Sequence, residues 1–236
     1  MGKRPGGELA NRPLHFIWIA DCSGSMQADG KIQALNQAIR EALPHMRSVA
    51  NENPRAKVLI RALRFSDRPE WHIPSPTPVE DFKWVDLKAG GKTSMGKALR
   101  MVAEQLRVPP MEARALPPVL VLISDGQPTD DFGGGMAAIL AEPWGQQAVR
   151  VGIGIGVDAD YDVLTRFIGN QSIKPLQADN PDTLVRYIRW ASTTVLKAAS
   201  SPSRPPAENS TTEPISIDIP FPPIVTPSDS SGPLVW

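Results

Sequence analysis

The sequence predicts an α/β fold, a doubly wound and mainly parallel sheet with helices on both of its faces. The strongest observation is the run from Val119 to Ile123, which is rich in branched apolar residues and does not alternate with polar ones. A strand covered by helices on both faces has this composition. A second continuous strand is expected at 149–157, and segments of helical periodicity alternate with the strands along the chain. Such alternation is typical of a parallel sheet wound in both directions.

The first half of the chain is expected to supply two buried strands, at 15–20 and 58–65, with a helix between them. Apolar residues at spacings of three and four mark one face of this helix: Ile32, Leu35, Ile39, Leu43, Met46 and Ala50. Pro44 lies inside it and is expected to kink or interrupt it near Leu43, because proline removes a backbone hydrogen bond. Three prolines make the stretch 70–87 irregular, with at most a short strand at 82–85.

The second half continues the alternation. A helix follows Thr93, presents Met95, Leu99, Val102 and Leu106 to the core, and ends before two prolines. Three glycines at 133–135 form a flexible entry to a helix that runs to Leu140. Helices are also expected at 160–168 and 181–199, the latter opened by cap residues and a proline in its first turn. The predicted domain therefore spans 14–200, after a polar lead at 1–13.

A proline-rich tail follows at 201–236, with nine prolines, four acidic residues and one basic residue. This composition is typical of a disordered tail. However, Ile215, Ile217, Ile219 and Phe221 alternate at the period of a strand. We therefore expect residues 213–236 to dock as an extended segment on the domain itself or on a partner's sheet edge.

The composition argues against several classes of function. Lys and Arg together equal Asp and Glu together, at 25 each, so global charge does not favour a nucleic-acid partner. No apolar run reaches 18 residues, which predicts no membrane span and a cytoplasmic protein. The single cysteine, Cys22, is expected to be a buried free thiol, and the three histidines lack ligand spacing, so zinc is not indicated.

Polar side chains follow two of the predicted strands and one glycine-rich turn. Asp21, Ser23 and Ser25 come directly after the first strand, Thr93 follows Gly90-Gly91-Lys92, and Asp125 follows the strand at 119–123. The carboxyl ends of strands in an open α/β sheet are where loops form a binding crevice. Three hydroxyls and two carboxylates suit a hard divalent cation, which predicts Mg²⁺, with Mn²⁺ or Ca²⁺ as alternatives.

These motifs resemble the metal-ion-dependent adhesion site of von Willebrand factor type A domains. The Asp-x-Ser-x-Ser motif, the Gly-Gly-x-Thr turn and the Ile-Ser-Asp-Gly-Gln-Pro-Thr-Asp segment match its three parts, and the resemblance runs from about Leu14 to Ala199. It implies a non-enzymatic module in which an Asp or Glu of a protein partner completes the metal shell. Within the family, the chain resembles the bacterial TerY-like branch. That branch implies a stress-response or tellurium-resistance system, with a protein kinase and a PP2C-type phosphatase as partners.

Two other functions are compatible with the sequence. The first alternative is an adaptor of an AAA+ ATPase, because the chain also resembles other intracellular domains of this family, which are implied to have that role. The second alternative is a Mg²⁺-dependent phosphotransferase in which Asp21 forms an aspartyl-phosphate. Against it, the acidic residue that haloacid-dehalogenase-like enzymes place two positions later is Ser23 in this chain.

Overall fold

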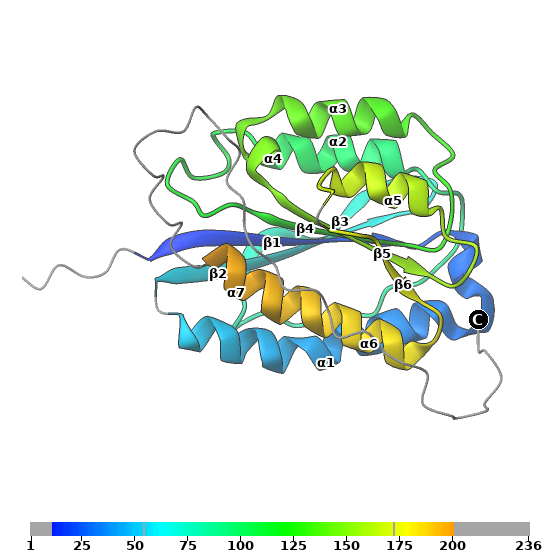
Figure 1. Cartoon of the computed structure of the whole chain (residues 1–236), viewed down its shortest axis with the longest axis horizontal. Coiled ribbons are helices and arrows are strands. Elements are labelled where there is room, and N and C mark those ends of the chain that lie inside the picture. The colour runs from blue at the N-terminus through cyan, green and yellow to red at the C-terminus, as the bar shows by residue number, and fades with distance from the viewer. Residues whose placement is uncertain (1–10, 54, 172, 201–236) are drawn as a thin grey trace, which may run out of the picture.

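The computed structural model describes residues 11–53, 55–171 and 173–200, which form a six-stranded sheet with helices on both faces (Figure 1). The strand order is β3-β2-β1-β4-β5-β6. The strands are β1 (Arg12–Asp21), β2 (Ala56–Phe65), β3 (Glu70–Pro78), β4 (Val119–Ser124), β5 (Val149–Ile155) and β6 (Leu176–Ala178). All neighbouring pairs are parallel except β2 with β3. The predicted doubly wound, mainly parallel fold is confirmed.

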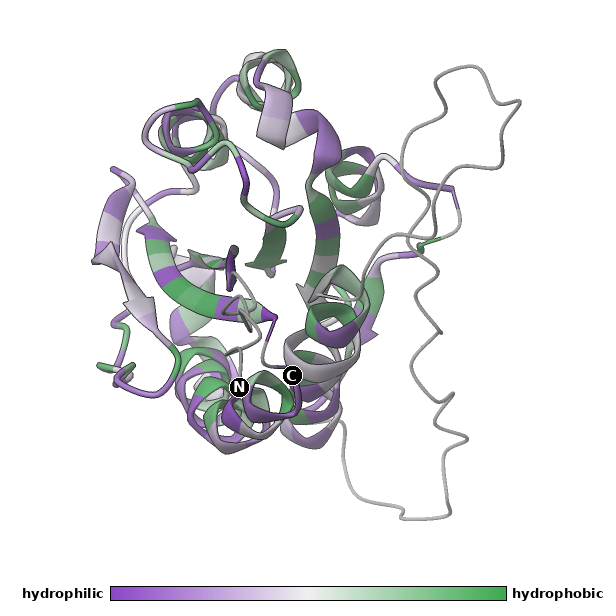
Figure 2. Cartoon of the chain, turned by 90° about the vertical axis from the view of Figure 1, so that its left-hand side faces the viewer, coloured by the Kyte–Doolittle hydropathy of each residue, from purple (hydrophilic) through white to green (hydrophobic). Residues whose placement is uncertain are grey.

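The helices lie in two layers (Figure 1). One layer contains α1 (Lys31–Glu52), α6 (Pro181–Trp190) and α7 (Leu196–Ser200), and the other contains α2 (Met95–Gln105), α3 (Phe132–Ala141), α4 (Pro143–Gln147) and α5 (Tyr161–Ile168). Each layer packs on one face of the sheet and forms its own apolar cluster. Figure 2 shows apolar strands between the two helical layers. The central strands are therefore buried on both faces, as their composition predicts.

The central pairing places the ends of β1 and β4 side by side. In this parallel pair, Ala20 lies opposite Ile123. The polar residues that follow each strand therefore leave the sheet at the same edge. The short 3₁₀ segment η1 (Gly24–Gly30) connects β1 to α1 at this edge. The loops that follow β1 and β4 therefore begin side by side, as expected.

The stretch 70–87 differs from its prediction. Residues Glu70–Pro78 form β3, the antiparallel edge strand, whereas 82–85 is not a strand. The prolines at 74, 76 and 78 lie inside β3. An edge strand tolerates proline because only one of its sides bonds to a neighbouring strand. The pairing with β2 also shifts register between Ile60 and Leu63, which accommodates the irregular backbone.

Two helices also differ from expectation. Pro44 does not interrupt α1, which runs continuously through it from Lys31 to Glu52. The segment expected as one helix at 181–199 contains a π-helical turn, η2 (Ala191–Val195), between α6 and α7. Hydroxyls bond back to the preceding turn there, Ser192 to the carbonyl of Ile188 at 2.5 Å and Thr193 to that of Arg189 at 2.8 Å. Such back-bonding is known to bend helices.

Helices α2 and α3 approach each other closely at two glycines. A Cβ added to Gly96 would lie 2.2 Å from the carbonyl oxygen of Asp131, and one added to Gly135 would lie 2.6 Å from that of Gly96. By contrast, a Cβ on Gly133 would meet its nearest atom at 3.7 Å. The glycines at 135 and 96 therefore permit the close crossing that holds the start of α2 in place.

A buried histidine lies near the start of β1, far along the strand from its polar end. His15 is 4% exposed, and its Nε2 lies 2.8 Å from Glu112. Burial lowers the pKa of His15, and the nearby Arg61 lowers it further, while the bond to Glu112 raises it. The neutral imidazole is therefore the form that the folded protein favours.

The predicted lead and tail are only partly described. β1 begins at Arg12, inside the lead predicted at 1–13. The tail at 201–236, with its predicted docking segment, lies outside the described residues. In the part of the chain that is described, no helix is both long enough and apolar enough to cross a membrane.

Candidate metal centre

The strand ends bring four of the five predicted ligands into one hydrogen-bonded cluster. Ser25 Oγ donates to Asp125 Oδ1 at 2.7 Å, and Ser23 Oγ lies 3.0 Å from Ser25 Oγ. Because the proton of Ser25 is directed to Asp125, Ser23 is the donor in that second bond. The backbone N–H of Ser23 donates to Asp21 Oδ1 at 2.8 Å. The cluster thus joins the loop after β1 to the end of β4.

Thr93 reaches the same place through backbone contacts between loops. The N–H of Gly24 donates to the carbonyl of Gly91 at 2.8 Å, and the N–H of Gly90 donates to that of Cys22 at 2.7 Å. These two bonds fasten the glycine-rich turn to the loop that carries Ser23 and Ser25. Thr93 follows the turn and is buried. All three loops predicted to form the site therefore meet at one edge of the sheet.

Two aspartates outside the predicted ligand set fix the loop that carries Thr93. Asp67 Oδ1, after β2, accepts a bond from the N–H of Lys92 at 2.9 Å. The carboxylate of Asp130 accepts bonds from the N–H groups of Gly96 and Lys97, at 2.7 and 2.9 Å. Asp130 therefore caps the first turn of α2 from another loop, a role that carboxylates commonly fill at helix starts. Thr93 lies between these two anchors.

Ser124, the last residue of β4, also belongs to the cluster although the sequence did not indicate it. Its Oγ donates to Asp21 Oδ2 at 2.5 Å. Both oxygens of Asp21 therefore accept hydrogen bonds. Burial nevertheless dominates and raises the pKa of Asp21 from 3.8 to about 6, while the bonds from Ser124 and Ser23 act in the opposite direction. A nearby cation would favour the charged carboxylate.

Lys31 is the second residue that sequence reasoning missed. Its Nζ donates to Asp125 Oδ2 at 2.9 Å, and both side chains are buried. A signal was present, because Lys31 is the first residue of α1 and a cation at a helix N-terminus opposes the helix dipole. Such a placement indicates a specific anionic partner. The apolar periodicity of the helix alone did not reveal it.

The donor set fits a hard divalent cation. Its atoms are hydroxyl and carboxylate oxygens, which Mg²⁺, Mn²⁺ and Ca²⁺ prefer as ligands. Within the described ranges, no group of three or more His, Cys, Asp and Glu side chains is placed to hold a metal.

Cys22 faces the apolar cluster with Trp18 and Met26, and burial raises the pKa of its thiol to about 12. The prediction of a buried free thiol is confirmed.

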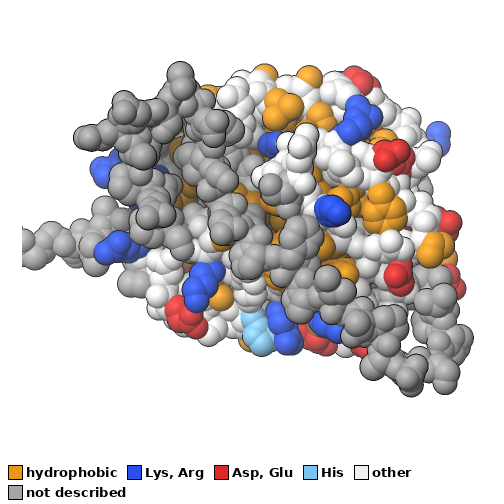
Figure 3. All heavy atoms as spheres, in the orientation of Figure 1, with side chains coloured by type: hydrophobic (Ala, Val, Ile, Leu, Met, Phe, Trp, Pro, Cys, Tyr) orange, Lys and Arg blue, Asp and Glu red, His pale blue; other side chains and the backbone are white. Residues whose placement is uncertain are grey.

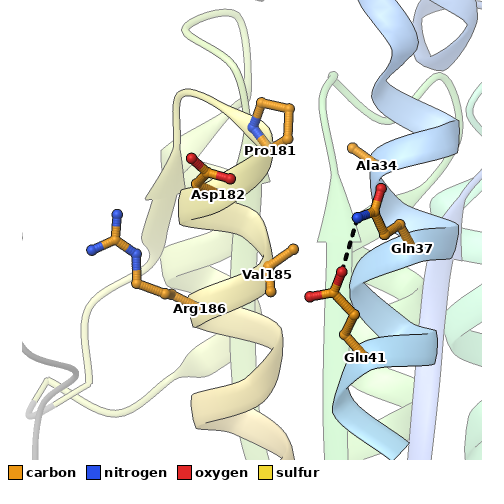
Figure 4. A pocket seen from close by; sticks show the side chains of 7 residues that line it. All are labelled: Ala34, Gln37, Glu41, Pro181, Asp182, Val185 and Arg186. Carbon is orange, nitrogen blue, oxygen red and sulfur yellow. Dashed lines mark hydrogen bonds between the residues drawn. The ribbon is translucent and has the colours of Figure 1, made fainter. Parts of the chain in front are cut away.

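A pocket of about 350 Å³ lies between α1 and α6, and none of the predicted metal ligands lines it (Figure 4). Its lining residues are Ala34, Gln37, Glu41, Pro181, Asp182, Val185 and Arg186. Gln37 bonds to Glu41 at 2.8 Å along α1. The polar residues of the lining are partly or fully exposed, which gives no buried charge to orient a ligand. On the face in Figure 3, basic and acidic side chains are scattered where atoms are not grey.

The chain is similar to known proteins both in sequence profile and in structure. The profile of the von Willebrand factor type A domain matches residues 17–186. A von Willebrand factor type A protein from Catenulispora acidiphila has a similar structure, with a TM-score of 0.61 at 17% identity over 80% of this chain and 43% of that chain. The pilus adhesin SpaC from Lactobacillus rhamnosus GG, in its open conformation, gives 0.61 at 13% identity over 80% and 30%.

Proximal thread matrix protein 1 of the mussel byssus was solved with zinc in its metal-ion-dependent adhesion site (MIDAS) motif. It gives a TM-score of 0.57 at 16% identity over 80% of this chain and 47% of that chain. The chain thus spans less than half the length of each of these three proteins. No curated protein matches it. At these identities the likeness concerns the fold alone. The profile match covers most of the sequence, however, and the chain therefore belongs to the von Willebrand factor type A domain family.

Proposed function

We propose that the chain is a metal-dependent protein-binding module. Ser23, Ser25 and Thr93 would hold a divalent cation, with Asp21 and Asp125 beside it, and an Asp or Glu of the partner would complete its ligand shell. The observation that carries this proposal is the bonded cluster of Ser23, Ser25 and Asp125 at the meeting point of two strand ends. Domains of this family are generally interaction or adhesion modules, which supports the same function.

The donors suit Mg²⁺ without selecting it over other hard divalent cations. Neutral hydroxyls transfer little charge to a cation, and they leave it electron-poor and attractive to a further carboxylate. Mn²⁺ and Ca²⁺ accept the same oxygen ligands, so the identity of the ion follows from cellular abundance more than from this site. A zinc-occupied MIDAS motif in the mussel byssus protein supports divalent-metal binding by a motif of this kind.

A binding role fits Asp21 better than an aspartyl-phosphate mechanism does. Asp21 is fully buried, and its two carboxylate oxygens accept bonds from the Ser23 backbone and from Ser124. A nucleophile needs a free oxygen that reaches the substrate. The residue two positions later is Ser23, which does not serve as a carboxylic acid–base group. Domains of this family are also usually non-catalytic.

The finer proposals concern the biological system. We extend the proposal to a cytoplasmic bacterial stress or tellurium-resistance system, with a protein kinase and a PP2C-type phosphatase as partners and no nucleic acid. An adaptor of an AAA+ ATPase is the alternative. Both come from the resemblance of the motifs to particular branches of the family. Affinity purification from the native cell, with and without EDTA, distinguishes them by which enzymes are recovered and by whether their recovery requires metal.

The metal site itself is tested by titration calorimetry with Mg²⁺ and Mn²⁺. Ser25→Ala removes a proposed ligand from an exposed position, so it should weaken binding about tenfold or more without unfolding the domain. Ser48→Ala, at an exposed position on α1, is the matched control and should bind as the wild type does. Equal affinity in the wild type and Ser25→Ala would remove Ser25 from the site. Absence of metal binding by the wild type would refute the proposal.

A further inference from the structure

We propose that Lys31 is a fixed counter-ion of the metal centre, which competes with a divalent cation for the charge of Asp125 and so lowers the affinity of the centre for that cation. The inference rests on the proposed function and extends it to regulation of the same site. Its consequence is that metal is held weakly until a partner contributes its own carboxylate.

Asp125 is bonded to both the metal-site loop and Lys31. Its two oxygens have separate partners, since Oδ1 accepts from Ser25 at 2.7 Å and Oδ2 accepts from Lys31 at 2.9 Å. The carboxylate is fully buried and the lysine side chain is 8% exposed. A buried ion pair is stable only when its bonds are retained, because breaking one leaves a charge without a partner. A metal that ligated Asp125 directly would have to share the charge of this carboxylate with the ammonium of Lys31.

A tight turn before α1 determines where Lys31 lies. Asp29 and Gly30 have φ angles of 52° and 75°, so two consecutive residues adopt the left-handed conformation before α1 begins. This turn places Lys31 at the helix start, where its Nζ bonds to Asp125, the residue after β4. A cation at that position is opposed by the helix dipole. The lysine is therefore held there by its bond to Asp125 and not by the preference of the helix.

Lys31 reduces the net negative charge of the metal centre. Asp21 and Asp125 together supply two negative charges when both are ionised, and Lys31 reduces that sum to one. A divalent cation bound beside Ser25 is repelled by the nearby ammonium group. This repulsion is strong because the pair is buried, where salt and water screen charges poorly. Replacing the lysine with a neutral side chain should therefore tighten metal binding.

The functional consequence follows from the remaining charge. A metal that faces neutral hydroxyls and only one net negative charge keeps a strong attraction for a further carboxylate. The partner's Asp or Glu supplies it, so partner and metal strengthen each other's binding, as reciprocal coupling requires. Without Lys31, the centre would hold its metal tightly even when no partner is present. The coupling between metal and partner would then be smaller.

The experiment is calorimetric titration of the full chain with Mg²⁺ and Mn²⁺ at low and at moderate salt. Lys31→Met and Lys31→Gln remove the charge, Lys31→Arg retains it, and Lys97→Met is the control. Lys97 is exposed on α2, close to the loop of Thr93. Circular dichroism, recorded with and without Mg²⁺, establishes that each variant is folded.

We expect Lys31→Met and Lys31→Gln to bind metal about tenfold tighter or more, a difference that salt changes little. Lys31→Arg and Lys97→Met should stay within a few-fold of the wild type. If the neutral variants bind metal equally or more weakly than a wild type that does bind it, the role of Lys31 is refuted and the proposed function stands. Binding by the neutral variants alone supports the role of Lys31 and contradicts the proposed function. If neither form binds metal, both proposals fail.

Discussion

Removal of Asp125 should destabilise the metal-free domain through the lysine that it leaves behind. In Asp125→Ala, the ammonium of Lys31 stays buried, 6% exposed for the residue as a whole, and has lost the carboxylate 2.9 Å away. Breaking a buried ion pair by deleting one partner costs about 3–5 kcal/mol. That is a large share of the roughly 5–15 kcal/mol by which a domain is stable. A surface ion pair would contribute about 1 kcal/mol at most.

The assay is urea unfolding in EDTA of the wild type, of the single variants Asp125→Ala and Lys31→Met, and of the double variant. Removing both partners leaves no unpaired charge, so the double variant should recover most of the loss. The double-mutant cycle should then give a coupling energy of about 2–3 kcal/mol, which neighbours in contact can reach. Additive losses, or an Asp125→Ala variant as stable as the wild type, would show that the pair is not buried and coupled as described.

Three further outcomes are expected. Thr93→Ala should weaken Mn²⁺ binding in calorimetry about tenfold, since it removes one proposed ligand; unchanged affinity would place Thr93 outside the centre. Gly96→Ala should lower the free energy of unfolding by about 1–3 kcal/mol, because its Cβ meets backbone of α3, whereas Gly133→Ala should be neutral in the same urea assay. His15→Gln should reduce the loss of stability that the wild type shows as pH falls below about 6.5. Melting temperatures at pH 7.5 and 5.5 test this, and an equal loss in both proteins would contradict it.

The sign of the histidine effect follows from its lowered pKa. The unfolded chain binds the proton more readily than the folded one. The contribution of His15 to stability is therefore complete above the unfolded pKa, and it is lost as pH falls from there through the lower pKa of the folded state. Asp21 acts in the opposite direction, since burial raises its pKa to about 6 and folding then favours the protonated acid. Its contribution is lost as pH rises through about 6. Asp21 is present in both proteins, so the difference in their loss of melting temperature between pH 7.5 and 5.5 reports the contribution of His15 alone.

The sequence predicted those features that depend on local pattern and on strand ends. Val119–Ile123 is apolar at every position, which identifies a strand covered on both faces. Asp21 and Asp125 follow directly after such strands, and neighbouring parallel strands bring their carboxyl ends together. Family-like motifs then supplied the third loop, with Thr93. The fold and the meeting of the three loops were therefore predictable from the sequence.

Other features depend on contacts between distant parts of the chain. Lys31 and Asp125 lie 94 positions apart, and the sequence around the lysine does not indicate which residue it bonds. Ser124 appears as an ordinary strand end until its hydroxyl meets Asp21. β3 contains three prolines, and its tolerance of them depends on its place at the edge of the sheet. β6 has only three residues, too few for a periodic pattern.

We propose that this edge of the sheet binds a divalent cation through hydroxyl oxygens. The most direct test is a crystal structure of the protein with Mn²⁺, with the anomalous signal of the metal recorded. We expect one strong peak within about 2.0–2.2 Å of the side-chain oxygens of Ser23, Ser25 and Thr93, with Lys31 still bonded to Asp125. A peak elsewhere in the molecule, or no peak here at saturating Mn²⁺, would contradict it.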